Sequence, residues 1–86
     1  MSSITLAFSS SGARPLSELR PGYRGVVLEV RAGDGGRSDR LLGLGVTPGA
    51  RVTVLQTFPG IVFLCDQTEL AVERGVAESI MVSVDR

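Results

Sequence analysis

The segment RLLGLGVTPGARVTV, residues 40–54, places three glycines between a leucine cluster and an alternating run of apolar and polar residues. Glycines at this density raise the question of a phosphate-binding loop. A dinucleotide-binding fingerprint reads G-x-G-x-x-G and lies between a strand and a helix. The last spacing among Gly43, Gly45 and Gly49 is one residue too long, and here the predicted helix precedes the glycines. We therefore interpret the segment as a helix that stops at Gly45, followed by a turn and a strand.

The dipeptide Pro-Gly occurs three times in the sequence, each time before a strand-like run. Proline fixes φ for the second position of a type II turn, and glycine supplies the positive φ required at the third position. This chemistry predicts tight turns at Pro21-Gly22, Pro48-Gly49 and Pro59-Gly60.

Apolar residues at every second position predict short strands, because successive side chains of a strand point to opposite faces. Five strands are predicted, near residues 23–31, 51–58, 61–66, 70–72 and 80–84. Two short helical segments are predicted near residues 38–45 and 74–79. Such a chain is mainly β and is expected to form a small barrel or sandwich, since closure of the sheet removes exposed edges.

The same alternation predicts which side chains share a face. In the first strand the shared face is expected to consist of Val26, Leu28 and Val30. In the second strand it is expected to consist of Val52, Val54 and Phe58.

The length of 86 residues corresponds to one domain. Residues 1–12, MSSITLAFSSSG, are expected to be an N-terminal tail, and residues 13–86 the single domain. Ile4, Leu6 and Phe8 alternate, so a short strand that pairs elsewhere is the alternative to a loosely packed tail.

Several residue types that enzymes rely on are missing. The sequence has no histidine and no lysine, and all nine basic residues are arginine. It therefore lacks the histidine of Ser-His-Asp and Cys-His systems and the lysine of a P-loop. These absences argue against a self-contained enzyme. Paired carboxylates, such as Glu69 and Glu73, are the remaining catalytic alternative.

Charge and hydropathy limit the classes of partner. The net charge is zero, and no basic cluster of the kind that nucleic-acid binding needs is visible in the sequence. The longest apolar run, IVFLC at residues 61–65, is far shorter than the roughly 20 residues of a membrane-spanning helix. The N-terminus lacks the basic start of a signal peptide. We expect a cytoplasmic protein that neither binds nucleic acid nor inserts directly into a membrane.

Cys65 is the one cysteine, so an internal disulfide is excluded, and a single thiol fits a reducing compartment. Its place in an apolar run predicts a packed side chain. Together with Asp66 and Glu69 it is a weak candidate for an adventitious divalent metal site, alone or shared with a second molecule. No cofactor is expected to be required.

Three segments, in order and at suitable spacing, resemble the FeoA family of bacterial ferrous iron transport. They are LSELRPGYRGVV at 16–27, RLLGLGVTPGARVTVL at 40–55 and LAVERGVAESIMV at 70–82. The resemblance implies a small SH3-like β-barrel of about five strands with one or two short helices. It also implies an accessory protein that binds the cytoplasmic GTPase part of the FeoB transporter and modulates transport. A cytoplasmic protein of this kind could be recruited to the inner membrane through its partner.

Candidate partner-binding residues follow from the way SH3-like domains use exposed aromatic residues and loops. We nominate Tyr23, Arg40, Leu42 and Phe58, with the helix near 38–45 as a presented surface. Leu42 points away from the face that Leu41 and Leu44 are expected to share. The alternative for each residue is a structural role. Tyr23 and Phe58 would then close the ends of the barrel, and Arg40 would pair with a nearby acidic residue.

One other interpretation of the function stays open. SH3-like modules also occur in metal-dependent transcriptional regulators, although this sequence shows no helix-turn-helix segment. The sequence is also compatible with a weak homo-oligomer.

Overall fold

The computed structural model describes residues 13–31 and 37–85. The predicted tail and its alternating residues, Ile4, Leu6 and Phe8, lie outside this part of the chain. The elements are β1 (Ala13–Pro15), η1 (Leu16–Glu18), β2 (Arg24–Val30), α2 (Arg37–Gly43), β3 (Arg51–Gln56), β4 (Ile61–Cys65), β5 (Thr68–Val72), α3 (Arg74–Ala77) and β6 (Ile80–Val84). Within the described residues, no helix has the length and apolar character needed to cross a bilayer.

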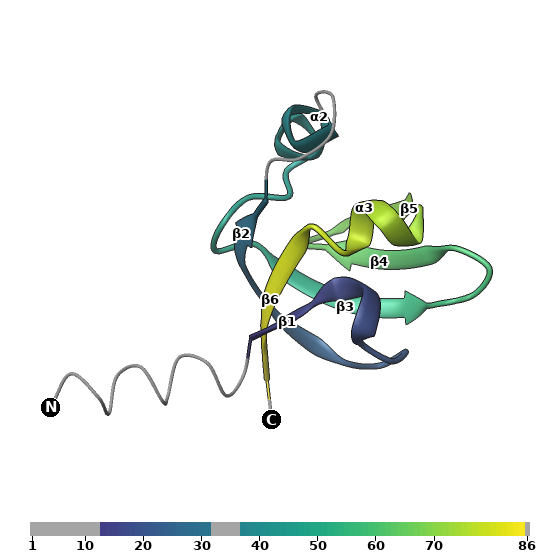
Figure 1. The fold of residues 1–86 in the computed structure, drawn as a ribbon. Coiled ribbons are helices and arrows are strands. Elements are labelled where there is room, and N and C mark those ends of the chain that lie inside the picture. The colour runs from purple at the N-terminus through teal and green to yellow at the C-terminus, as the bar shows by residue number, and fades with distance from the viewer. Residues whose placement is uncertain (1–12, 32–36, 86) are drawn as a thin grey trace, which may run out of the picture.

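All six strands belong to one antiparallel sheet with the order β1-β6-β2-β3-β4-β5. Figure 1 shows the sheet curling around α3 and η1, with α2 standing off one end. The five predicted strands and both predicted helices are present, and the mainly β, SH3-like fold class is confirmed. A sixth strand, β1, was not predicted because three residues are too few to show alternation.

The prediction of a closed barrel is wrong, because the sheet stays open. β1 pairs with β6 and β5 pairs with β4, and among the described residues no pairing joins these two edge strands. Instead η1 and α3 pack against each other, and Leu16 of η1 and Ala77 of α3 both belong to the core. In the described part of the chain no ladder of hydrogen bonds bridges the two edges.

The core fills the inside of the curled sheet with alternate strand residues. β4 shows the pattern most clearly, since Ile61, Phe63 and Cys65 are buried and the residues between them are half-buried. Leu16 from η1 and Ala77 from α3 close the open side. The remaining buried residues are Leu19, Val27, Leu41, Val46, Ala50, Val52, Val54, Ile80 and Val82.

The predicted face of the first strand is wrong because β2 contains an irregularity. Its register against β6 shifts between Val27 and Glu29. Val27 is therefore buried, whereas Leu28, expected to share a face with Val26 and Val30, is 45% exposed. A bulge of this kind inserts one residue and turns the following side chains to the other face.

The second strand is irregular in the same way. Its register against β4 shifts between Val54 and Gln56, where β3 ends. Val52 and Val54 are buried as predicted, but Phe58 is 81% exposed on the β3–β4 loop. The expectation that Phe58 shares their face is therefore wrong.

Two of the three Pro-Gly pairs have the backbone that the turn prediction requires. Gly22 and Gly49 have φ of 94° and 96°, and Gly45, the predicted helix stop, has φ of 97°. The third pair differs, because Gly60 does not have a positive φ and the peptide bond before Pro59 is cis. Pro59-Gly60 therefore reverses the chain without a type II turn.

Gly25 lies on β2 at a point where the neighbouring strand β6 approaches it closely. A Cβ built at this residue would overlap the carbonyl oxygen of Ser83 and the side chain of Val82. Because one of these neighbours is backbone within the sheet ladder, it cannot move aside without disturbing the pairing of β2 with β6. Glycine is therefore required here by space rather than by φ.

We predict that Gly25→Ala lowers the free energy of unfolding by about 1–3 kcal/mol, the usual cost of overpacking. Urea denaturation measures this change. Gly43→Ala is the matched control, because a Cβ at Gly43 meets nothing within 4 Å. That variant is expected to leave stability unchanged or to raise it by up to about 1 kcal/mol, since alanine favours the helix. Equal stability of the two variants would contradict the close-approach argument.

Candidate functional site

A groove of about 360 Å³ lies between α2, the end of β5 and α3. Its lining is mostly apolar, with one basic and one acidic residue. The lining residues are Arg40, Leu41, Leu44, Ala71, Val72, Glu73 and Val76. We call this hollow the α2–β5 groove. An apolar floor with a few charged groups at the rim is typical of a site that binds another molecule.

Helix α2 forms one wall of the groove and is held by few contacts to the core. Leu41 is buried, and its carbonyl oxygen accepts hydrogen bonds from the backbone N–H of Leu44 at 3.0 Å and of Val46 at 3.0 Å. Val46, also buried, returns the chain to the sheet. The rest of the helix stands away from the sheet in Figure 1, so its outer residues are available for contact.

Leu41 and Leu44 share a face of α2, as predicted, and that face looks onto the groove. Leu44 is nevertheless 49% exposed, because the groove is open to solvent. Leu42 points away from this face and is 45% exposed. The helix thus presents two large apolar side chains in different directions.

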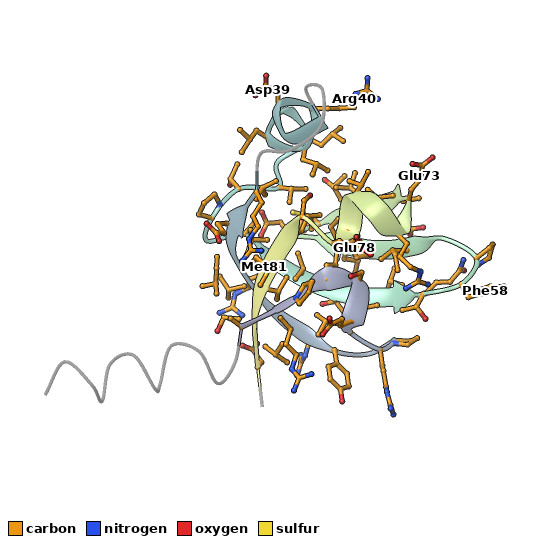
Figure 2. All side chains as sticks on the ribbon, viewed as in Figure 1. Asp39, Arg40, Phe58, Glu73, Glu78 and Met81 are labelled. Atoms are coloured by element: carbon orange, nitrogen blue, oxygen red, sulfur yellow. The ribbon has the colours of Figure 1, made fainter. Side chains whose placement is uncertain are left out.

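The charged rim of the groove consists of Arg40 on α2 and Glu73 at the start of α3. Figure 2 shows them on the two sides of the space between these helices, with Phe58 lower on the same side of the view. Within residues 13–31 and 37–85, the one ion pair joins Arg31 to Glu29. Among the side chains that the structure describes, Arg40 and Glu73 form no ion pair with each other or with another residue.

Arg74, next to Glu73, fixes the position of α3. Its guanidinium donates hydrogen bonds to the carbonyl oxygens of Thr57 at 2.6 Å and Ser17 at 3.3 Å. These bonds join α3 to the β3–β4 loop and to η1. The planar fork of arginine can reach two acceptors at once, so Arg74 holds one wall of the groove in place.

Of the four partner-binding candidates from the sequence, one lines the groove and three do not. Arg40 lines the groove, whereas Tyr23, Leu42 and Phe58 are exposed but do not line it. The groove residues that the sequence analysis did not consider are Ala71, Val72 and Val76; Leu44 lay in the helix nominated as a surface, and Glu73 was considered only as a catalytic carboxylate. No sequence signal connects residue 40 with residue 73, because only the fold brings them to one hollow.

The three metal candidates do not converge. Cys65 is 3% exposed, and its thiol donates to the carbonyl oxygen of Gly45 at 3.4 Å. Asp66 and Glu69 are exposed, and Asp66 accepts a hydrogen bond from the backbone N–H of Arg51 at 3.2 Å. In the described part of the chain, no three Cys, Asp or Glu residues form a cluster suited to a metal ion.

The carboxylates of the enzyme alternative are also separated. Glu73 lines the α2–β5 groove, but Glu69 does not. The pair therefore does not share the α2–β5 groove.

A second hollow, of about 220 Å³, lies where Arg24 and Arg51 meet Asp66 and Asp85. The backbone N–H groups of Asp66 and Asp85 donate to the carbonyl oxygens of Arg51 and Arg24, both within 2.8 Å. The two positive and two negative side chains balance, and the bonds tie together strand ends. We interpret this hollow as part of the sheet architecture.

The family model described as FeoA domain matches residues 14–84. The chain belongs to the FeoA family. A crystal structure of an iron uptake regulatory protein, FeoA, is 32% identical and superposes with a TM-score of 0.76, covering 85% of this chain and 97% of that chain. No curated protein matches the sequence.

Two further solved structures show how widely the FeoA fold occurs. Stenotrophomonas maltophilia FeoA, solved with zinc and described as an SH3 domain protein, is 24% identical with a TM-score of 0.73, covering 83% of this chain and 94% of that chain. A manganese-dependent transcriptional repressor with manganese is 24% identical with a TM-score of 0.78, covering 86% of this chain and 37% of that chain. At these identities the likeness concerns the fold.

We predict that the stability of this FeoA protein falls above pH 9.0 through Cys65. Burial, and then the charge of Asp66, raises the pKa of the thiol above its ordinary value of 9.0. The unfolded chain therefore loses this proton first, so the stabilisation is complete below pH 9.0 and is lost as pH rises through the folded pKa.

Urea denaturation at pH 7 to 11 measures the effect, and Cys65→Ala is the control. The chain has no lysine or histidine, so few other groups titrate in this range. We expect a smaller decline in the variant. Identical pH profiles would show that the thiol ionises equally in both states.

Proposed function

We propose that the protein is a small accessory protein of bacterial ferrous iron uptake that binds the cytoplasmic GTPase part of an FeoB-type transporter. Membership of the FeoA family supports the link to ferrous iron transport. Stenotrophomonas maltophilia FeoA is described as a candidate activating factor of that transport. The observation that carries the binding role is the α2–β5 groove, with its apolar floor and the charged side chains of Arg40 and Glu73 at its rim.

A binding protein of this kind acts on its partner by preferring one of the partner's conformations. It shifts the equilibrium only by the difference between its affinities for the two states. The groove suits this role, since it offers apolar contacts for affinity and charges for orientation. The proposed location is the cytoplasm, with recruitment to the inner membrane through the transporter.

A second candidate is a module of a metal-dependent transcriptional regulator. The superposition on a manganese-dependent repressor favours it at the level of the fold. This chain corresponds to 37% of that repressor, so DNA binding would have to come from elsewhere. Salt-sensitive binding of this chain to DNA would support the second candidate against the first.

We predict that Leu44→Glu weakens binding to the soluble GTPase domain of the FeoB-type transporter by about tenfold or more. The change places a charge on the apolar floor of the groove, and central apolar contacts carry most of the affinity of an interface. Titration calorimetry measures the affinity, and phosphate release measures GTP hydrolysis with and without the wild-type protein.

Leu28→Glu is the matched control. Leu28 is 45% exposed and Leu44 is 49% exposed, but Leu28 lies on β2, outside the groove. It is expected to retain wild-type affinity. Absence of any complex with the wild-type chain would refute the proposed function. Equal losses in both variants would place the contact elsewhere.

A further inference from the structure

The two edges of the sheet are protected to different degrees. The described residues of β1 are Ala13–Pro15, and Pro15 lacks an N–H. β5 has five residues, no proline, and a regular register against β4 from Thr68 to Val72. Natural edge strands are usually shielded by shortness, proline, bulges or charge, because unpaired backbone groups invite another strand. On β5 only the single charge of Glu69 serves this purpose.

The register of the β4–β5 hairpin shows which backbone groups of β5 face outward. Its loop has two residues, so Cys65 and Thr68 form a hydrogen-bonded pair, and such pairs recur at every second residue. Thr68, Leu70 and Val72 therefore direct their N–H and C=O groups toward β4. The corresponding groups of Glu69 and Ala71 face the free edge, and no group in the described part of the chain bonds to them.

The α2–β5 groove lies along this free edge. Ala71 and Val72 both line it, although neighbouring strand residues point to opposite faces. A hollow that touches both must lie beside the strand rather than over one face of the sheet. The outward backbone groups of Ala71 therefore border the same space that Leu44 and Val76 line from the two helices.

We propose that the free edge of β5 binds an extended segment of a protein partner, which adds to the sheet as a seventh strand. This proposal rests on the proposed function and specifies how the partner binds. An added strand gains affinity from main-chain hydrogen bonds and specificity from alternate side chains. Here one apolar side chain of the segment enters the groove between α2 and α3.

The rim charges specify what flanks that side chain. Arg40 stands on the α2 side and Glu73 at the end of β5, and neither has a partner among the described residues. Charge complementarity therefore requires an acidic residue of the segment near Arg40 and a basic residue near Glu73. The occupant is an extended protein segment with an apolar residue between an acid and a base.

Ala71→Pro in the full chain tests this proposal with the GTPase domain of the FeoB-type transporter as probe. The substitution removes an outward N–H and obstructs an added strand, while an edge strand tolerates proline where its N–H faces solvent. Ala71→Thr is the comparison variant, since it keeps the N–H and suits a strand but adds side-chain atoms at the groove. We expect about tenfold weaker binding for the proline variant, equivalent to the loss of one or two main-chain hydrogen bonds, and a smaller loss for the threonine variant.

Amide hydrogen exchange of the wild-type chain gives a second measurement that does not depend on folding of the variants. We expect the N–H groups of Glu69 and Ala71 to exchange rapidly in the free protein and slowly in the complex. A complex in which both remain fast would overturn the proposal while leaving the proposed function intact. Slow exchange in the free chain at every concentration would overturn it by showing that the chain covers its own edge. Protection that grows with concentration would overturn it in favour of a second copy.

If the GTPase domain does not bind the wild-type chain, the proposed function fails and the edge is tested separately. The probe is then a designed peptide of alternating valine and threonine, with glutamate near one end and arginine near the other. Saturable protection of Glu69 and Ala71 by this peptide, lost in Ala71→Pro, would support the docking site. Binding of the peptide without that protection would overturn it.

Discussion

The close approach of β6 to β2 at Gly25 is the constraint on which the rest of the molecule depends. β6 lies between β1 and β2 and is the last strand of the chain, so it joins the N-terminal strand to the rest of the sheet. The absence of a Cβ at residue 25 lets the backbone of Ser83 and the side chain of Val82 lie against β2. Without that close approach, β6 could not keep its register against β2, and β1, which pairs with β6, would shift with it.

The groove is a consequence of the same open architecture. Because the sheet does not close, its β5 edge remains beside α3, and α2 extends over it from the β2–β3 connection. Arg74 then links α3 to the β3–β4 loop through the carbonyl oxygen of Thr57 and to η1 through that of Ser17. The α2–β5 groove is therefore formed jointly by segments that lie far apart in the sequence.

Much of the fold could be predicted from the sequence, because short-range signals dominate it. Alternation located the strands, and positive φ at Gly22 and Gly49 follows from Pro-Gly turn chemistry. The failures have specific physical causes. Leu28 is exposed because a bulge changes the face of β2, and a bulge has no signature in a run of valine and leucine.

The candidate site was predictable only in part. Arg40 was nominated from its place on an exposed helix, and it does line the groove. Glu73 and Ala71 were not nominated as part of this surface, because their role depends on which strand lies at the edge of the sheet. That property follows from the strand order, and alternation within one strand contains no information about its neighbours.

The unequal edges of the sheet also limit how large an assembly this protein can build. A filament would need each molecule to offer a second edge as open as the first, and in the described part of the chain β1 ends in Pro15, which lacks an N–H. Contact between the β5 edges of two molecules would be self-complementary and would close after two. Strand addition therefore terminates at a discrete complex, and the fold combines an accessible edge with resistance to fibrous polymerisation.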